Sequence, residues 1–183
     1  FRLLEVLSEL SQDDRFFNQG AASSLLKMYN VPVQYVQMGD YTYFFADDGI
    51  HGMELWKTDG TASGTSMVKD INSGASSSYP ALNHHTMVVI GTTLYFPADD
   101  GSNGVELWKT DGTSSGTSIV KNINSGSSSS TPHRLTKLGS TLIFAADDGT
   151  NGHELWKSDG TASGTSMVKD IMTGITSSQS TSY

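Results

Sequence analysis

The fold of this chain is decided by residues 54–71, which read Glu-Leu-Trp-Lys-Thr-Asp-Gly-Thr-Ala-Ser-Gly-Thr-Ser-Met-Val-Lys-Asp-Ile. The same stretch returns as residues 106–123 and again as residues 154–171. The third copy differs from the first only at Ser158, and the second differs only at Ser114, Ile119 and Asn122. Self-similarity of this kind predicts a repeat architecture, in which each unit buries its apolar surface against the next copy.

Each repeat is longer than this conserved stretch. An aromatic segment and an Asp-Asp-Gly turn precede it every time, and a proline opens each copy at Pro32, Pro80 and Pro132. The tryptophans at 56, 108 and 156 set periods of 52 and 48 residues. The chain therefore divides into an N-terminal segment (1–31), repeat 1 (32–79), repeat 2 (80–131), repeat 3 (132–171) and a Ser/Thr-rich tail (172–183).

Turn residues cut each repeat into four short apolar runs, which predicts four antiparallel strands per repeat. In the third repeat these runs are 133–138, 141–146, 153–157 and 165–171. The expected fold is all-β, with three tandem four-stranded blades like those of a β-propeller. Pro97 interrupts the second run of its repeat, which predicts a bulge or an edge at that point.

The tryptophans Trp56, Trp108 and Trp156 occupy equivalent positions and are expected to pack between blades. If sheets cover both sides of a blade, Leu155 and Trp156 can both be buried although neighbouring side chains point to opposite faces. The alternative is a row of exposed tryptophans that stack on sugars.

The repeated string Glu-Leu-Trp-Lys-Thr-Asp-Gly-Thr-x-x-Gly-Thr resembles the ELWxxDGTxxGT repeat of very large secreted or surface proteins of bacteria and of algal proteins, some labelled hyalin-like or mastigoneme-like. The resemblance covers residues 32–171 in three copies. It implies an extracellular, propeller-like array, and it carries no catalytic residues that could be transferred to this chain.

Composition agrees with an exterior location. The chain has 19 acidic and 11 basic residues, a net charge of −8 and no cysteine. Nucleic acids and anionic membrane surfaces are therefore disfavoured partners, and no apolar run reaches the roughly 20 residues needed for membrane insertion. Serine and threonine are frequent in the links between repeats. This composition is typical of polar loops or of sites of O-glycosylation, so glycans are a candidate partner.

The N-terminal segment differs from the repeats because leucines recur in it at helical spacing, which predicts two short helices before the first blade. This segment either caps the array or docks on a neighbouring subunit. The candidate assembly residues are Leu3, Leu7, Leu10, Phe16 and Phe17.

Acidic turns recur in every copy, and in the first they contain Asp47, Asp48, Glu54 and Asp59. Oxygen ligands on glycine-bent turns suit calcium, so a structural calcium ion is one interpretation. The other is that aspartates such as Asp59, Asp111 and Asp159 form the turns by accepting hydrogen bonds from their own backbone. No other cofactor is indicated.

Catalytic motifs are missing from the sequence. The five histidines form no ligand pair of recognisable spacing, and neither a nucleophile elbow nor a phosphate loop appears. We therefore expect no enzyme. Two functions compete: an extracellular structural protein that self-associates into a filament or surface appendage, and an adhesive or lectin-like propeller that binds carbohydrate or protein. Three blades are fewer than the four to eight of closed propellers, which favours association between chains.

Overall fold

The computed structural model of the chain describes residues 34–79 and 87–173. These residues form twelve β-strands and no helix. The strands are β1 (Val36–Met38), β2 (Tyr41–Asp47), β3 (Met53–Thr58), β4 (Ser66–Lys69), β5 (Val88–Ile90), β6 (Thr93–Asp99), β7 (Val105–Thr110), β8 (Ser118–Lys121), β9 (His133–Leu138), β10 (Thr141–Asp147), β11 (His153–Ser158) and β12 (Ser166–Lys169). The helices expected in residues 1–31 lie outside the described residues.

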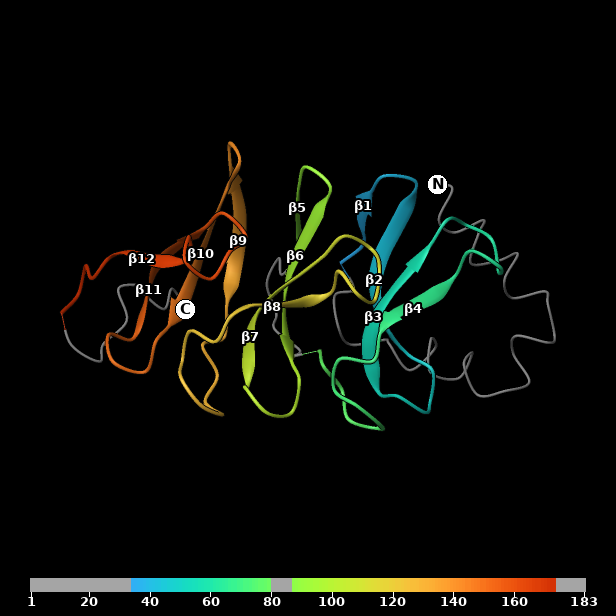
Figure 1. Ribbon diagram of the computed structural model, residues 1–183, viewed down its shortest axis with the longest axis horizontal. Helices are drawn as coiled ribbons and strands as arrows, with labels where there is room; N and C mark the ends of the chain where they lie inside the picture. Colours follow the sequence, from blue (N-terminus) through green and yellow to red (C-terminus); the bar gives the residue numbers. More distant parts are fainter. Residues whose placement is uncertain (1–33, 80–86, 174–183) are drawn as a thin grey trace, which may run out of the picture.

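Each repeat forms one antiparallel sheet whose strands follow chain order. We call these sheet 1 (β1–β4), sheet 2 (β5–β8) and sheet 3 (β9–β12). The three sheets stand side by side in a row, with sheet 2 in the middle (Figure 1). Contacts join the first strands of neighbouring sheets, because β5 contacts both β1 and β9. The all-β class and the four strands per repeat are thus confirmed.

Alternation along the third strand of each sheet explains how the sheets stack. In β7, Leu107 lies in the core shared with sheet 3, whereas the adjacent Trp108 lies in the core shared with sheet 1. Successive side chains of a strand point to opposite faces. We call the face that a sheet turns toward the following repeat its forward face, and the opposite face its rear face.

Two cores fill the spaces between the sheets. The forward face of sheet 1 packs against the rear face of sheet 2, with Phe45 and Leu55 meeting Phe96 and Trp108. The forward face of sheet 2 packs in the same way on the rear face of sheet 3, where Phe144 and Trp156 are buried. Most positions of the two interfaces hold equivalent residues, as in a linear repeat array, although Pro97 stands in sheet 2 where sheet 1 has Phe45.

The fourth strand is shorter than the sequence predicts. In sheet 3 it covers Ser166–Lys169, whereas the apolar run extends from 165 to 171. The backbone N–H of Ile171 donates to the carboxylate of Glu154 at 3.2 Å. Because this backbone N–H donates to a side chain, it cannot also donate to a neighbouring strand. The fourth strand therefore ends before Ile171.

The register at Pro97 decides between the two alternatives expected there, a bulge and an edge. Strand β6 pairs with β7 without a shift through Pro97, which lies opposite Leu107, so no bulge occurs there. On the other side, β5 pairs with β6 only as far as Tyr95. Among the described residues, β6 is therefore paired with another strand on one side only at Pro97. This position suits proline, because its backbone has no N–H to donate.

Candidate association site

A buried glutamate on the third strand of each sheet holds the segment that follows the fourth strand of the same repeat. Both carboxylate oxygens of Glu54 accept hydrogen bonds: Oε1 from the backbone N–H groups of Asn72 (3.2 Å) and Ser78 (3.1 Å), and Oε2 from the Ile71 N–H (3.1 Å) and the Ser78 hydroxyl (2.6 Å). Glu106 repeats all four bonds with the equivalent donors. Burial raises the pKa of these two glutamates, although the hydrogen bonds act in the opposite direction.

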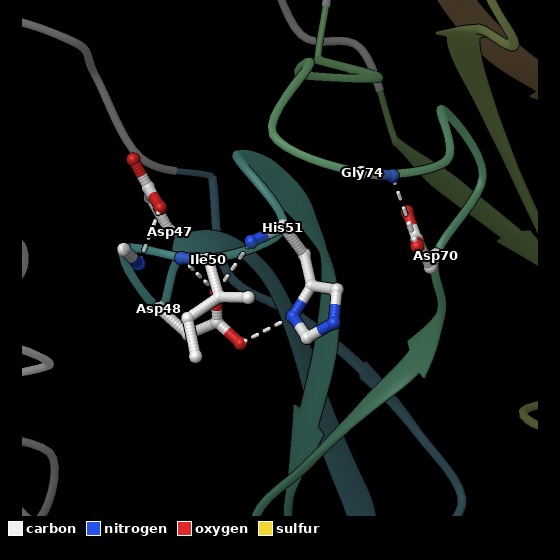
Figure 2. A network of polar contacts seen from close by, with 7 residues as sticks. Asp47, Asp48, Ile50, His51, Asp70 and Gly74 are labelled. Carbon is white, nitrogen blue, oxygen red and sulfur yellow. Dashed lines mark hydrogen bonds and ion pairs between the residues drawn. The ribbon is translucent and has the colours of Figure 1, made fainter.

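The aspartates of the turns accept hydrogen bonds within their own loops. Asp48 accepts the backbone N–H groups of Ile50 and His51 at 2.9 and 2.8 Å, and Figure 2 shows it beside both residues. Its other oxygen lies 2.7 Å from Nδ1 of His51. The hydrogen bond to Asp48 raises the pKa of the His51 imidazole.

The second set of turns follows the same chemistry. Oδ1 of Asp59 accepts both the backbone N–H of Thr61 (2.9 Å) and its hydroxyl (2.8 Å), and Asp111 and Asp159 make the equivalent pair of bonds. These bonds from threonine lower the pKa of all three aspartates. The turn-forming role predicted for them is therefore confirmed.

The calcium candidates of the first repeat do not form one site. Asp47 bonds the N–H of Gly49, Glu54 is saturated by its four donors, and Asp59 belongs to a separate turn. Within residues 34–79 and 87–173, no group of three or more His, Asp or Glu side chains lies close enough to hold a metal ion. The carboxylates present thus do not fit a calcium ion of the expected kind.

The structure brings together two histidines that are far apart in the sequence. The rings of His133 and His153 meet edge to face with centroids 5.1 Å apart. Nδ1 of His133 lies 3.0 Å from the Thr131 carbonyl oxygen. Sequence spacing alone missed this pair, because the contact depends on the pairing of β9 and β11 with β10.

The tryptophans differ in burial although their surroundings in the sequence are nearly identical. Trp108 and Trp156 are 6% and 5% exposed, whereas Trp56 is only half-buried. The first two lie on rear faces that another sheet covers. Trp56 lies on the rear face of sheet 1, which no described residue of another repeat covers.

Two lysines on each covered forward face donate hydrogen bonds to the next sheet. Lys57 Nζ donates to the carbonyl oxygen of Gly112 (2.7 Å), and Lys69 Nζ donates to that of Thr117 (2.9 Å). In sheet 2, Lys109 and Lys121 make the same bonds to Gly160 and Thr165, at 2.8 and 2.9 Å. Neither pair was singled out from the sequence. The signal in the sequence that could have indicated these contacts is the recurrence of the lysines at equivalent positions of the repeats.

The forward face of sheet 3 is open. Val168 is 48% exposed and Ile171 is 62% exposed, whereas their counterparts in the first two repeats are at most 6% exposed. Leu138, Lys157 and Lys169 are exposed on the same sheet. Beside Lys157 the surface forms a hollow of about 320 Å³, which is lined by Thr141, Lys157, Ser158, Asp159, Ser163, Gly164 and Ser166.

The predicted assembly residues Leu3, Leu7, Leu10, Phe16 and Phe17 lie outside the described residues. Of the segments that the structure describes, none is a helix long and apolar enough to cross a membrane. Comparisons with protein-family models, with curated proteins and with solved structures find no match to this chain.

Proposed function

We propose that this chain is an extracellular structural repeat protein whose sheets associate end to end into a filament or surface appendage. The observation that carries the proposal is the open forward face of sheet 3, where Val168 and Ile171 are exposed at positions that are buried in both other repeats. Exposed apolar surface of this kind marks an association site. The resemblance to ELWxxDGTxxGT repeats supports the extracellular location.

The polar chemistry of the repeats also favours a structural role. The buried glutamates and the turn aspartates accept hydrogen bonds from backbone N–H groups of their own repeat. The same arrangement recurs from repeat to repeat. An active site normally occurs once. The proposal therefore includes no catalytic step and no cofactor, and the partner is another copy of the chain.

An adhesive or lectin-like propeller is the second candidate. The hollow beside Lys157 favours it, because its lining is rich in hydroxyl groups and includes Asp159. The sequence-based expectation for such a site is a tryptophan that stacks on the sugar, and no aromatic residue lines this hollow. A sugar-array screen that finds saturable binding, lost on Lys157→Ala, would favour this candidate.

Electron microscopy and sedimentation of the purified chain test the structural proposal. We expect assemblies that grow with protein concentration and appear as filaments of stacked sheets. Closed rings of fixed size would support association but not the filament. A monomer at every concentration would contradict the proposed function.

A further inference from the structure

We propose that the forward face of sheet 3 binds the rear face of sheet 1 in a second copy of the chain. This inference rests on the proposed function, and it adds which two surfaces pair and in which register. The two interfaces inside the chain supply the pattern, because lysines, tryptophans and apolar side chains at equivalent positions meet at both of them. Among residues 34–79 and 87–173, no other sheet covers the forward face of sheet 3, which carries one half of that pattern, or the rear face of sheet 1, which carries the other half.

The first element of the pattern is a lysine that reaches a glycine carbonyl. Lys57 donates to Gly112 at the first interface, and Lys109 donates to Gly160 at the second. Lys157 holds the same position in sheet 3 and is exposed. The equivalent glycine in sheet 1 is Gly60, which is also exposed, whereas Gly112 and Gly160 are buried. Lys157 of one copy therefore pairs with the Gly60 carbonyl of the next.

The second element combines a lysine, a threonine carbonyl and a tryptophan. Lys69 bonds the Thr117 carbonyl and lies 6.0 Å from the centroid of the Trp108 ring. Lys121 repeats this arrangement over Trp156 at 5.9 Å. Cations over an indole face are attracted by its quadrupole. The unused counterparts are Lys169, exposed on sheet 3, and the half-buried Thr65 and Trp56 on sheet 1.

The apolar side chains follow the same rule. Met38, Val68 and Ile71 are buried at the first interface, and their equivalents on sheet 3 are the exposed Leu138, Val168 and Ile171. On the rear faces, Phe96 and Phe144 are buried, whereas the equivalent Phe44 of sheet 1 is only half-buried. Within the part of the chain that the structure describes, each of these two faces thus lacks the kind of neighbour that the other one supplies.

Sheet 3 departs from the pattern at several positions, and two of the changes remove a polar group, whereas Thr136 introduces one where the other sheets have Val36 and Val88. Ile143 stands where the other sheets have Tyr43 and Tyr95, and Met172 stands where they have Asn72 and Asn124. Repeats within one chain are held together by their link, which raises their effective concentration. Separate chains lack that link, and the loss of the tyrosine hydroxyl and the asparagine amide lowers the cost of desolvating this face on association.

Two blocked variants test the pairing. Val168→Asp with Ile171→Asp places two carboxylates on the forward face of sheet 3. Trp56→Lys places a cation on the rear face of sheet 1, opposite the position of Lys169. A desolvated, unpaired charge in either face is expected to weaken association by about a hundredfold. Each variant alone should therefore sediment as a single chain at concentrations where the wild type assembles.

Mixing the two variants gives the decisive readout. The Trp56→Lys chain keeps its forward face and the double aspartate chain keeps its rear face, so an equimolar mixture should form a one-to-one pair that grows no further. Recovery of that pair also shows that both variants are folded. The control is Ile50→Asp, because Ile50 is exposed and the equivalent Ser102 and Thr150 stay exposed beside both internal interfaces. This control should assemble like the wild type.

Three results would overturn the inference in distinguishable ways. A monomeric wild type would refute the proposed function together with this pairing. A wild type that assembles while both blocked variants still assemble would leave self-association intact and place the interface elsewhere. A mixture of folded variants that stays monomeric, beside an assembling wild type, would show that the two end faces do not bind each other.

Discussion

At the scale of single residues, Glu106 shows how one side chain holds the end of a repeat in place. It is fully buried, and its carboxylate accepts hydrogen bonds from two neighbouring backbone N–H groups, at Ile123 and Asn124, and from both the N–H and the hydroxyl of Ser130. A carboxylate accepts at both oxygens, whereas a glutamine amide also donates. The site is thus specific for glutamate over its closest neutral analogue.

We predict that Glu106→Gln lowers the free energy of unfolding by about 1–3 kcal/mol, because the amide NH₂ faces at least one buried N–H donor. Burial raises the pKa of Glu106 above its unfolded value, so its favourable contribution is complete below the unfolded pKa and declines as pH rises through the folded pKa. The difference between wild type and variant should therefore be larger at pH 4 than at pH 8.

Denaturant unfolding at both pH values measures this difference. Ser130→Ala is the matched control, since it removes one hydroxyl donor and leaves three backbone bonds to the carboxylate. Its effect should be smaller than that of Glu106→Gln. A difference that grew with pH would contradict the direction of the pKa shift.

At the scale of elements, neighbouring sheets meet through the turn between their third and fourth strands. Gly112 in such a turn has φ of +92°, and a Cβ added there would collide with the hydroxyl of Tyr43 on sheet 1. Gly126 has nearly the same φ, +91°, but no atom lies within 4 Å of its added Cβ. The two glycines therefore separate backbone strain from contact between sheets.

We predict that Gly112→Ala destabilises the protein more than Gly126→Ala does. Both variants lose about 1 kcal/mol or more from the left-handed backbone, and only the first also pushes against Tyr43. Adding Tyr43→Phe should recover part of the loss in Gly112→Ala and none in Gly126→Ala. Thermal unfolding of the single and double variants measures this coupling. Equal losses for both alanine variants would show that the turn does not press on sheet 1.

At the scale of the whole molecule, stability is carried by the interfaces between sheets, and the tryptophans are their largest side chains. The indole N–H of Trp108 has no hydrogen-bond acceptor among the described residues, so its contribution comes from packing and from Lys69 above the ring. Truncating it leaves a cavity between sheets 1 and 2.

We predict that Trp108→Ala costs about 3–5 kcal/mol in the cooperative unit that contains it. Trp56→Ala should cost less in the isolated chain, because the half-buried Trp56 loses fewer contacts. Chemical denaturation below the concentration of assembly measures both, and iodide quenching supplies an independent check. Quenching of Trp108 as efficient as that of Trp56 would contradict the burial on which this ranking depends.

The local sequence was sufficient to predict the strands and turns of this protein. Leu107 and Trp108 alternate between faces, and Asp59 bonds its own turn, because these features depend on residues that are neighbours in the chain. The end of the fourth strand could not be read in this way. It depends on a glutamate that lies 17 residues earlier in the sequence.

Only the tertiary structure decided which copies of an identical residue are buried. Leu155 and Trp56 have the same neighbours in sequence as Leu107 and Trp108, yet both are half-buried. The difference arises because burial is supplied by the adjacent sheet, and Leu155 and Trp56 lie on the two end faces. By itself, the sequence determined three equivalent units and the two-sided pattern of each. The stacking of those units determined which two faces no other sheet of the described residues covers.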